Sequence, residues 1–592
     1  MISKIWYLLE HYAVFIAFIW AFWGFGQTVL ARILNLAIDD QTLSAALTVI
    51  FGQGIFIVML QCLAVKGILL NAWIIALLIG GGILGVIELR RTERYLLTWL
   101  TQALRYTSKT ERCGIALMAI YVAPMLLAPL ATPFPGDELL YHLPHAQQWA
   151  QSGYLSVNDW LRYPWFPYNY ELLFAGAFVV YGDVFTHMFN MLAGLLVALI
   201  TFRLGVRHFS KASGFIATII WIQINRGEFC KSLVDMGLTL YTLAAAITFY
   251  WWVKEPKDRR WLAVSAFLIG VAVGSKYQGL IFLPFFGMIL IWVDRKPTTW
   301  LLTAVCILLP CVYWYARNAI MTGDPFNPFG GKLFGFHDWN LTDYANQFND
   351  LKLHSGWPHW LLWPAVFSLW WPNIRKSPVH IAATVFCAFI FIIWLETSHY
   401  PRYLMPIVPL LALLAAEKWC YLIEFVGSRV ARQKSRINFP SIKHLTWTFT
   451  FVVVSISSAT ISEKYWSRIS TNQETRNVLL RKKIPGYLVL EYAAKHPMGR
   501  IYIIGSLTDS IYYAPHPIWG DFFGPWRYSD IVSNNPAQLS NNLLMRHFDA
   551  VIVDGSLCYE LELNLTFQQY FSIEFQSDGA KIYRLKKNTH AA

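Results

Sequence analysis

Long hydrophobic runs, separated by short polar segments, fill most of the chain between residues 12 and 463. About fourteen of these runs approach the roughly 20 apolar residues that a helix needs to cross a lipid bilayer. From about residue 470 the pattern changes to charged segments with short β-like runs, at 500–505, 549–555 and 580–585. The pattern predicts a polytopic α-helical membrane protein with about 12–14 transmembrane helices and a small C-terminal external α/β domain.

These changes of pattern divide the chain into three predicted parts. Residues 1–112 contain N-terminal transmembrane helices and a basic loop, 113–465 a catalytic transmembrane core with an external loop at 134–183, and 466–592 the external domain. Composition supports the membrane class, because 56% of the 592 residues are hydrophobic and only 14% are charged. Soluble domains carry about 25% charged residues.

The positions of the basic residues predict how the chain crosses the membrane. Basic segments recur between the runs, at 90–112, 203–211, 254–260, 294–296, 375–376 and 429–443. Cytoplasmic loops of membrane proteins are enriched in Lys and Arg. This rule places loop 134–183 and everything after about residue 464 on the external side of a multi-pass inner-membrane protein. It also accounts for the net charge of +13 without a nucleic-acid partner, for which no basic-aromatic module is visible.

Two adjacent carboxylates stand out in the polar stretch from Thr132 to Tyr170. Asp137 and Glu138 follow Pro135-Gly136, directly after a hydrophobic run. A carboxylate at a membrane surface can serve as a general base, removing the proton from an attacking hydroxyl group. The same pattern is also an ordinary first turn of a helix, where the helix dipole favours negative charge. Asp137 and Glu138 are therefore candidate catalytic residues.

Two histidines follow the acid pair and raise the question of a metal. If 137–150 is helical, Glu138, His142 and His145 share one face, as residues three and four apart do. Two histidines and a carboxylate are suitable ligands for a divalent cation. Pro144 interrupts this helix, and histidines that line a cavity need no metal. We expect Tyr141, His142 and His145 to line the cavity and assign no metal ligand, and a divalent metal cofactor stays the less favoured alternative.

Three cations occur at helix ends that the orientation above places on the external side. They are Lys276 in GSKYQG, Arg317 in WYARNAIM and Arg402 in SHYPRYLMP, which also contains His399. Arg grips a phosphate through two hydrogen bonds and Lys through a point charge. Lys276, Arg317, Arg402 and His399 are therefore candidate ligands of a phosphate group. The alternative is that the Lys and Arg side chains extend from helix ends to the membrane surface without binding a ligand. Asp235 either lines the same cavity or pairs with Arg226 or Lys231.

The order of these motifs resembles a known family. GDELLYHLPHAQQWAQSG, FPYNYELLF, SLVDMGLTLYTL, GVAVGSKYQGLIFLP, WYARNAIMTGDPFNPF and PRYLMPIVPLLALLA follow one another over about residues 113–426. The set is similar to bacterial GT-C superfamily membrane glycosyltransferases, relatives of the lipid-linked-sugar protein mannosyltransferases and of the lipid A aminoarabinose transferase. The chain departs from the simplest family layout in its three extra N-terminal spans, and its first loop contains no DxD metal motif.

The resemblance implies a glycosyltransferase. The donor would be a sugar on a polyprenyl phosphate, the acceptor a lipid, glycan or protein, and Asp137 would match the family's acidic residue in the first external loop. Glu138 would share or replace its role, and Lys276, Arg317 and Arg402 would hold the donor phosphate.

Two other function classes stay open from the sequence. A transporter or flippase for a lipid-linked glycan needs charges along a path through the bilayer, whereas the charges here gather on one side. A non-catalytic subunit for glycan assembly would use the external domain to bind a partner.

Overall fold

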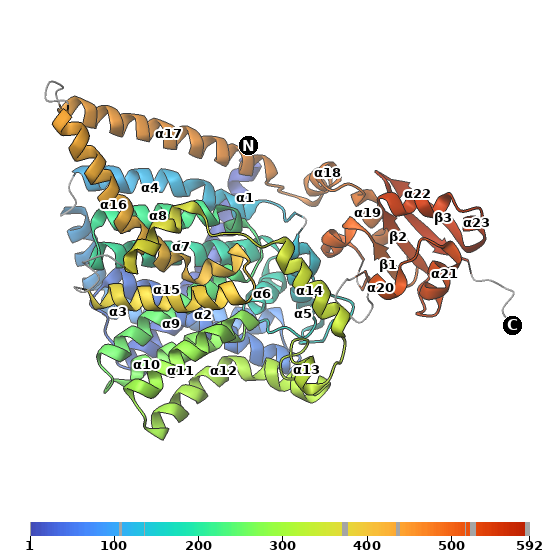
Figure 1. Ribbon diagram of the computed structural model, residues 1–592, viewed down its shortest axis with the longest axis horizontal. Coiled ribbons are helices and arrows are strands. Elements are labelled where there is room, and N and C mark those ends of the chain that lie inside the picture. The colour runs from blue at the N-terminus through green and yellow to red at the C-terminus, as the bar shows by residue number, and fades with distance from the viewer. Residues whose placement is uncertain are drawn as a thin grey trace.

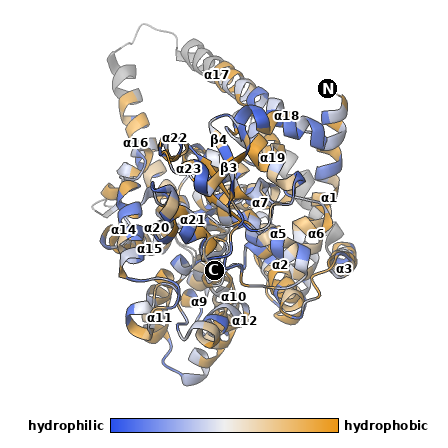
Figure 2. Cartoon of the chain, turned by 90° about the vertical axis from the view of Figure 1, so that its right-hand side faces the viewer, coloured by the Kyte–Doolittle hydropathy of each residue, from blue (hydrophilic) through white to orange (hydrophobic). Residues whose placement is uncertain are grey.

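The computed structural model describes residues 2–105, 109–134, 136–369, 377–433, 439–515, 517–520 and 528–586. The helices α1 to α17 form one bundle, and most of them lie side by side in Figure 1. The C-terminal part, from α18 to β4, stands at one end of this bundle. In Figure 2, which faces this end, hydrophobic colouring runs along helices such as α16 and α17, and hydrophilic colouring is frequent on loops and short helices.

Nine helices within the described residues are long and apolar enough to cross a membrane. They are α1 (Ile2–Gln27) with its π-helical extension Thr28–Ile33, α2 (Gln41–Val65), α3 (Asn71–Arg105), α4 (Lys109–Leu127), α7 (Val184–His208), α9 (Asp235–Lys254), α12 (Pro297–Thr322), α15 (Pro378–Glu396), and α16 (Val408–Gln433) with the preceding 3₁₀ helix Pro401–Ile407. The other helices of the bundle are α5 (Leu143–Ser152), α6 (Glu171–Val180), α8 (Lys211–Asn225), α10 (Arg259–Val273), α11 (Leu283–Val293), α13 (Gly331–Phe334), α14 (Leu341–Leu353) and α17 (Phe439–Arg468).

The predicted helical membrane fold is confirmed, but several apolar runs are not full spans. The runs at 211–226, 261–276 and 278–293 form α8, α10 and α11, which have 15, 15 and 11 residues. The run at 358–373 begins as the 3₁₀ helix Trp360–Leu369, because Pro364 lies inside it and cannot donate a helical hydrogen bond. Between α10 and α11 the chain turns sharply at Gly279, where a Cβ atom would lie 2.7 Å from the carbonyl oxygen of Ala272.

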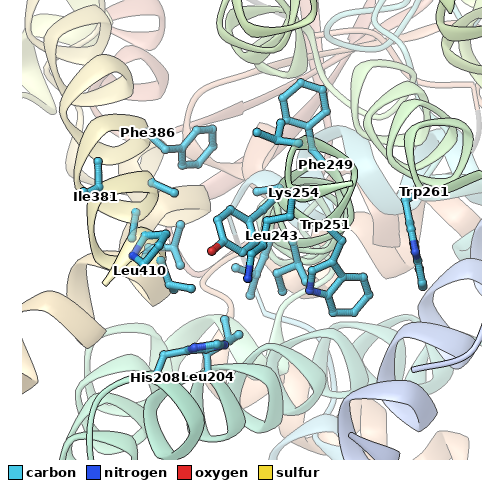
Figure 3. Close-up of a pocket in the computed structure, with 18 of the residues that line it drawn as sticks. Leu204, His208, Leu243, Phe249, Trp251, Lys254, Trp261, Ile381, Phe386 and Leu410 are labelled. Atoms are coloured by element: carbon cyan, nitrogen blue, oxygen red, sulfur yellow. The ribbon is translucent and has the colours of Figure 1, made fainter. Parts of the chain in front are cut away.

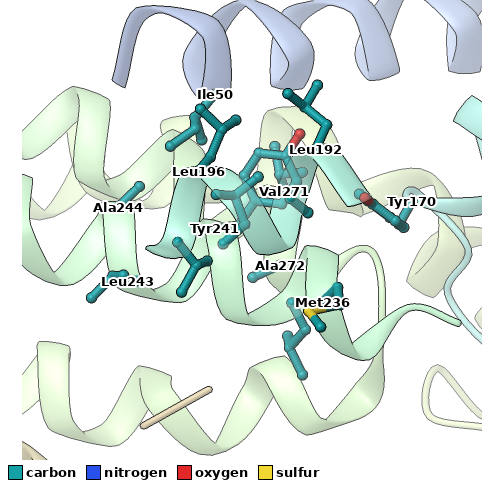
Figure 4. Packing of buried hydrophobic residues seen from close by; sticks show 14 of the residues in the cluster. Ile50, Tyr170, Leu192, Leu196, Met236, Tyr241, Leu243, Ala244, Val271 and Ala272 are labelled. Atoms are coloured by element: carbon teal, nitrogen blue, oxygen red, sulfur yellow. The ribbon is translucent and has the colours of Figure 1, made fainter. Parts of the chain in front are cut away.

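The centre of the bundle is a continuous hydrophobic core. Figure 4 shows its packing, with Leu192 of α7, Tyr241 of α9 and Val271 of α10 turned toward one another. All three side chains are buried. The N-terminal helices α1 and α2 pack closely at Gly52 of α2. Any larger residue there would clash, because its Cβ atom would lie 1.7 Å from the carbonyl oxygen of Phe22 in α1. Small residues at such crossings let membrane helices approach closely.

The basic segments gather at the end of the bundle away from the C-terminal part. Contacts there join the loop after α1 to the ends of α7 and α10: Arg203 binds Asp40 at 2.7 Å, and Arg260 donates to the carbonyl oxygen of Leu34 at 3.0 Å. Arg259 lies 3.5 Å from Asp294. The expected basic residues Arg375 and Lys376 lie outside the described residues.

The C-terminal part is a four-stranded sheet with helices around it. The strand order is β1-β2-β4-β3, in which β1 and β2 are parallel and the other pairs are antiparallel. The three predicted runs are confirmed as β1 (Ile501–Ile504), β2 (Ala550–Asp554) and β4 (Ala580–Leu585), whereas β3 (Phe571–Ser577) was not predicted. Its side chains are mostly exposed or half-buried, so its hydrophobic signal is weak. The helices are α18 (Gln473–Lys483), α19 (Tyr487–Lys495), α20 (Tyr528–Ile531), α21 (Pro536–Leu544), α22 (Ser556–Glu562) and α23 (Phe567–Tyr570).

Candidate active site

Asp137 stands at the start of a short π-helical turn, Glu138–His142, that leads into α5. The turn is entered through Gly136, whose φ of 139° favours glycine. Asp137 occupies the position of a helix cap, yet its carboxylate accepts no capping hydrogen bond. π-Helical turns are rare and frequent at functional sites. Pro135, the other residue of the expected Pro-Gly turn, lies outside the described residues.

The Asp137 carboxylate instead binds a cation from a distant part of the chain. Its Oδ2 accepts a hydrogen bond from Nη2 of Arg402 at 2.9 Å. Nε of Arg402 lies 3.9 Å from Oδ2 of Asp235, and Oδ1 of Asp235 accepts from Nζ of Lys276 at 2.8 Å. These four residues form a chain of alternating charge that we call the charge cluster. It joins loop 134–183, the 3₁₀ helix before α16, the start of α9 and the turn after α10.

Asp137 is the most exposed member of the charge cluster, and Asp235 is the most buried. The exposed fractions of the side chains are 3% for Asp235, 15% for Lys276, 22% for Arg402 and 32% for Asp137. Among the described residues, the buried Nε of Arg402 has no hydrogen-bond partner. An unpaired buried donor on a charged group is costly unless a ligand uses it. The more exposed end of the charge cluster therefore presents the carboxylate of Asp137 and the guanidinium group of Arg402, with the ammonium group of Lys276 nearby.

Arg402 sets the protonation state of Asp137. Burial alone would raise the pKa of this carboxyl group, but the positive charge of Arg402, followed by that of His142, lowers it below its ordinary value of 3.8. Asp137 is thus ionised at neutral pH. This is the form that a general base requires.

Glu138 lies elsewhere, although it is the neighbour of Asp137 in sequence. Its Oε2 contacts Nε2 of His187 at 2.9 Å and accepts from the backbone N–H of Ser232 at 2.8 Å. Its Oε1 accepts from the backbone N–H of Phe134 at 3.2 Å. The buried Glu138 carboxylate therefore connects loop 134–183 to α7 and to the segment before α9, and it does not belong to the charge cluster.

The residues expected to line the cavity with the acid pair are packed into the protein. His142 contacts the buried Glu171 at 2.7 Å, and His145 contacts the carbonyl oxygen of Arg162 at 2.9 Å. Burial lowers the pKa of His145 to about 3, so this histidine is neutral. Tyr141 is buried and meets Tyr163 edge to face.

The metal alternative required Glu138, His142 and His145 to converge on one face. The three side chains bind different partners, which are His187, Glu171 and Asn158. Because the π-helical turn changes the spacing along 138–142, the expected face is not formed. Glu171, which the sequence did not single out, is the residue that holds His142.

Two of the expected phosphate ligands have other surroundings. Arg317, in α12, is buried between the rings of Trp314 and Trp165 and donates to the side chain of Asn318 and the carbonyl oxygen of Phe166. The ring of His399 packs against Trp394 and Trp357. The structure thus brings Lys276 and Arg402 together but surrounds Arg317 and His399 with aromatic rings.

The expected pairing of Asp235 with Arg226 or Lys231 is wrong. Lys231 binds Glu228 at 2.8 Å instead, and Asp235 binds Lys276, which is 41 residues away. The other expectation for Asp235, a place in the same site as Asp137, agrees with its position next to Arg402.

The C-terminal part contacts the loop that contains Asp137. The backbone N–H of Gly136 lies 3.5 Å from the carbonyl oxygen of Asp509, and the hydroxyl of Tyr513 donates to the carbonyl oxygen of Pro133 at 2.8 Å. Arg476 of α18 forms an ion pair with the buried Asp183, which also accepts from Tyr512 at 3.0 Å.

Comparisons by sequence match limited parts of the chain. A family model described as SF2091/S2213 matches residues 475–584. Two relatives are from Shigella flexneri. The uncharacterized protein SF2092/S2214 is 27% identical over 146 residues, which cover 22% of this chain and 79% of the relative. The uncharacterized protein SF2093/S2215 is 31% identical over 131 residues, which cover 21% of this chain and 64% of the relative.

The bundle resembles solved membrane proteins in fold. The crystal structure of ArnT from Cupriavidus metallidurans in the apo state superposes with a TM-score of 0.53 at 13% identity, covering 81% of this chain and 98% of that chain. The same protein bound to undecaprenyl phosphate gives a TM-score of 0.51 at 12% identity, covering 80% and 98%. The chain has the GT-C fold. The resemblance carried by the order of the motifs and the similarity in fold therefore agree.

Proposed function

We propose that the protein is a membrane glycosyltransferase that moves a sugar from a polyprenyl-phosphate donor to an acceptor at the external face. The charge cluster of Asp137, Arg402, Asp235 and Lys276 is the observation that supports this proposal most directly. The similarity in fold to ArnT, which was also solved with bound undecaprenyl phosphate, supports the class of donor.

In the proposed reaction the donor phosphate enters at the more exposed end of the charge cluster. Its oxygens accept from the guanidinium group of Arg402 and are attracted by Lys276. Arg402 then shares its charge between the phosphate and Asp137. Because Arg402 is the strongest influence that lowers the pKa of Asp137, sharing it makes Asp137 a better proton acceptor when the donor is bound.

The chemical step is a direct displacement. Asp137 removes the proton of the acceptor hydroxyl, the acceptor oxygen forms a bond to the anomeric carbon, and the bond from that carbon to the phosphate oxygen breaks with inversion. The electron pair of the broken bond stays on the polyprenyl phosphate. Arg402 and Lys276 stabilise this developing negative charge, and Asp235 holds the two cations in place.

A transporter or a non-catalytic assembly subunit is less well supported by the same contacts. The cluster lies at one end of α9, whereas transport of a charged headgroup requires polar groups along the path. An assembly subunit has no need for the unused donor of Arg402.

The decisive experiment measures sugar transfer from a lipid-linked donor by the purified protein. Asp137→Asn removes the base without changing the size of the side chain, so turnover should fall about 10²- to 10⁴-fold. Asp350→Asn is a matched control, since Asp350 is about half exposed in α14, and it should leave turnover unchanged. Unchanged turnover in Asp137→Asn rules out this base, and movement of the lipid without covalent transfer favours the transporter.

A further inference from the structure

A cavity of about 1080 Å³ lies at the end of the bundle opposite the charge cluster. It is formed by the ends of α7 and α9, together with α11, α15 and α16. α9 begins at Asp235 in the charge cluster and lines the cavity from Leu243 to Lys254, its last residue. Leu243 comes eight residues after Asp235, about 12 Å along the helix, and no member of the charge cluster lines the cavity, so the cavity is a separate site.

The walls of the cavity are hydrophobic. Figure 3 shows Ile381, Phe386 and Leu410 on one side, Leu204 and His208 below, and Phe249 and Trp251 on the other side. The volume is slightly above the range of about 300–1,000 Å³ that is common for small-molecule pockets. Such a space between apolar helices in a membrane suits hydrocarbon chains.

The polar end of the cavity contains two cations, Arg207 and Lys254, and Lys254 lies over the ring of Tyr250. Within the described part of the chain, neither Arg207 nor Lys254 forms an ion pair with a carboxylate. Arg207 and His208 are neighbours at the end of α7, and both line the cavity together with Lys254. Two carboxylates, Asp39 and Glu255, also line the cavity.

One buried hydroxyl group in the cavity is also unused. Tyr250 of α9 lines the cavity, and its hydroxyl oxygen is buried without a hydrogen-bond partner among the described residues. An unpaired buried hydroxyl is destabilising by about 1–3 kcal/mol, and buried polar groups usually have partners. A ligand with an oxygen acceptor next to its apolar chains would satisfy this donor.

We propose that the cavity binds an anionic phospholipid. The acyl chains would fill the apolar walls, the phosphate group would lie near Arg207 and Lys254, and an ester or phosphate oxygen would accept from Tyr250. Basic pockets between transmembrane helices on the cytoplasmic side are a known type of site for anionic headgroups. The gathering of basic segments at this end of the bundle agrees with that side.

The experiment measures lipid binding to the purified full chain in detergent by native mass spectrometry. Phosphatidylglycerol and phosphatidylcholine are the two probes, because they differ in headgroup charge and share their acyl chains. Phosphatidylglycerol should bind more tightly. Arg207→Ala with Lys254→Ala should weaken its binding about five-fold for each cation removed, from roughly 1 kcal/mol each. Arg295→Ala, an exposed cation between α11 and α12, is the control and should have no effect.

A second variant tests the apolar part of the cavity. Ala246→Trp fills the cavity from α9 while retaining both cations, so it should lower the occupancy of phosphatidylglycerol. Equal binding of the two phospholipids, or wild-type binding by the double Ala variant, would overturn the proposal. Preferential retention of polyprenyl phosphate over phosphatidylglycerol would also overturn it. None of these readouts depends on sugar transfer.

Discussion

Asp137 and Glu138 are adjacent carboxylates with different surroundings. Asp137 is partly exposed and binds Arg402, whereas Glu138 is buried and binds His187 and Ser232. A helix-capping role for Asp137 would require its oxygen to accept a backbone N–H, and no such bond is formed. At the scale of single residues, the binding partners therefore distinguish Asp137, the proposed base, from Glu138, which has a structural role.

The pairing of Asp137 with Arg402 predicts a change in pH dependence. Arg402 holds the pKa of Asp137 below 3.8, so the base stays ionised down to a pH below that value. In Arg402→Gln only burial and weaker charges act on Asp137, and its pKa rises. The acidic limb of kcat/KM against pH should then move to higher pH, and kcat should fall about 10²- to 10³-fold with the lost donor.

Lys276→Ala is the matched control for this pH profile. Lys276 also belongs to the charge cluster, but it binds Asp235. Its removal should slow transfer and leave the acidic limb where it is in the wild type. An acidic limb that stays in place in Arg402→Gln would contradict the role of Arg402 in setting the pKa of Asp137.

At the scale of elements, the π-helical turn Glu138–His142 is held at both ends. Glu138 fixes its start to α7 and to the segment before α9, and His142 fixes its end to Glu171 of α6. Three packed elements thus position the loop, and Asp137 is directed toward Arg402 as a consequence.

Glu138→Ala tests whether this residue is structural. The change leaves His187 and the N–H of Ser232 without their buried partner, and loss of one member of such a pair costs about 3–5 kcal/mol. The midpoint of thermal unfolding in detergent should fall clearly in Glu138→Ala, while Asp137→Asn should shift it little. A Glu138→Ala protein with wild-type stability and no activity would instead assign Glu138 to the reaction.

Much of this arrangement could be predicted from the sequence, because the signals involved are local. Asp137, Lys276 and Arg402 stand out as charged residues at the ends of apolar runs. The partner of Glu138 could not be predicted, since His187 lies 49 residues away on another helix. Hydropathy alone predicts spans at α8, α10 and α11, because it reports apolar content and not the point at which a helix ends.

At the scale of the whole molecule, the C-terminal part touches the loop of the charge cluster directly. Trp160 and Leu161 of loop 134–183 belong to the hydrophobic core of the C-terminal part, and Tyr512 packs with Leu139. The Arg476–Asp183 ion pair joins α18 to the start of α7. The C-terminal part thus shares its core with the segment that presents Asp137.

Arg476→Ala tests this coupling. Burial alone would raise the pKa of Asp183, but Arg476 holds it below its ordinary value, so removing Arg476 leaves a buried and poorly compensated carboxylate. The expected cost is about 3–5 kcal/mol. Backbone hydrogen exchange at 133–142 should therefore accelerate, and turnover should fall because Asp137 is less well positioned.

Arg481→Ala is the matched control within the same helix. Arg481 pairs with Glu491 at 2.7 Å, but its side chain is 44% exposed, and exposed ion pairs contribute only about 0–1 kcal/mol. Hydrogen exchange at 133–142 should be the same as in the wild type. If Arg476→Ala matched Arg481→Ala in exchange and turnover, the ion pair with Asp183 would not couple the C-terminal part to the loop of Asp137.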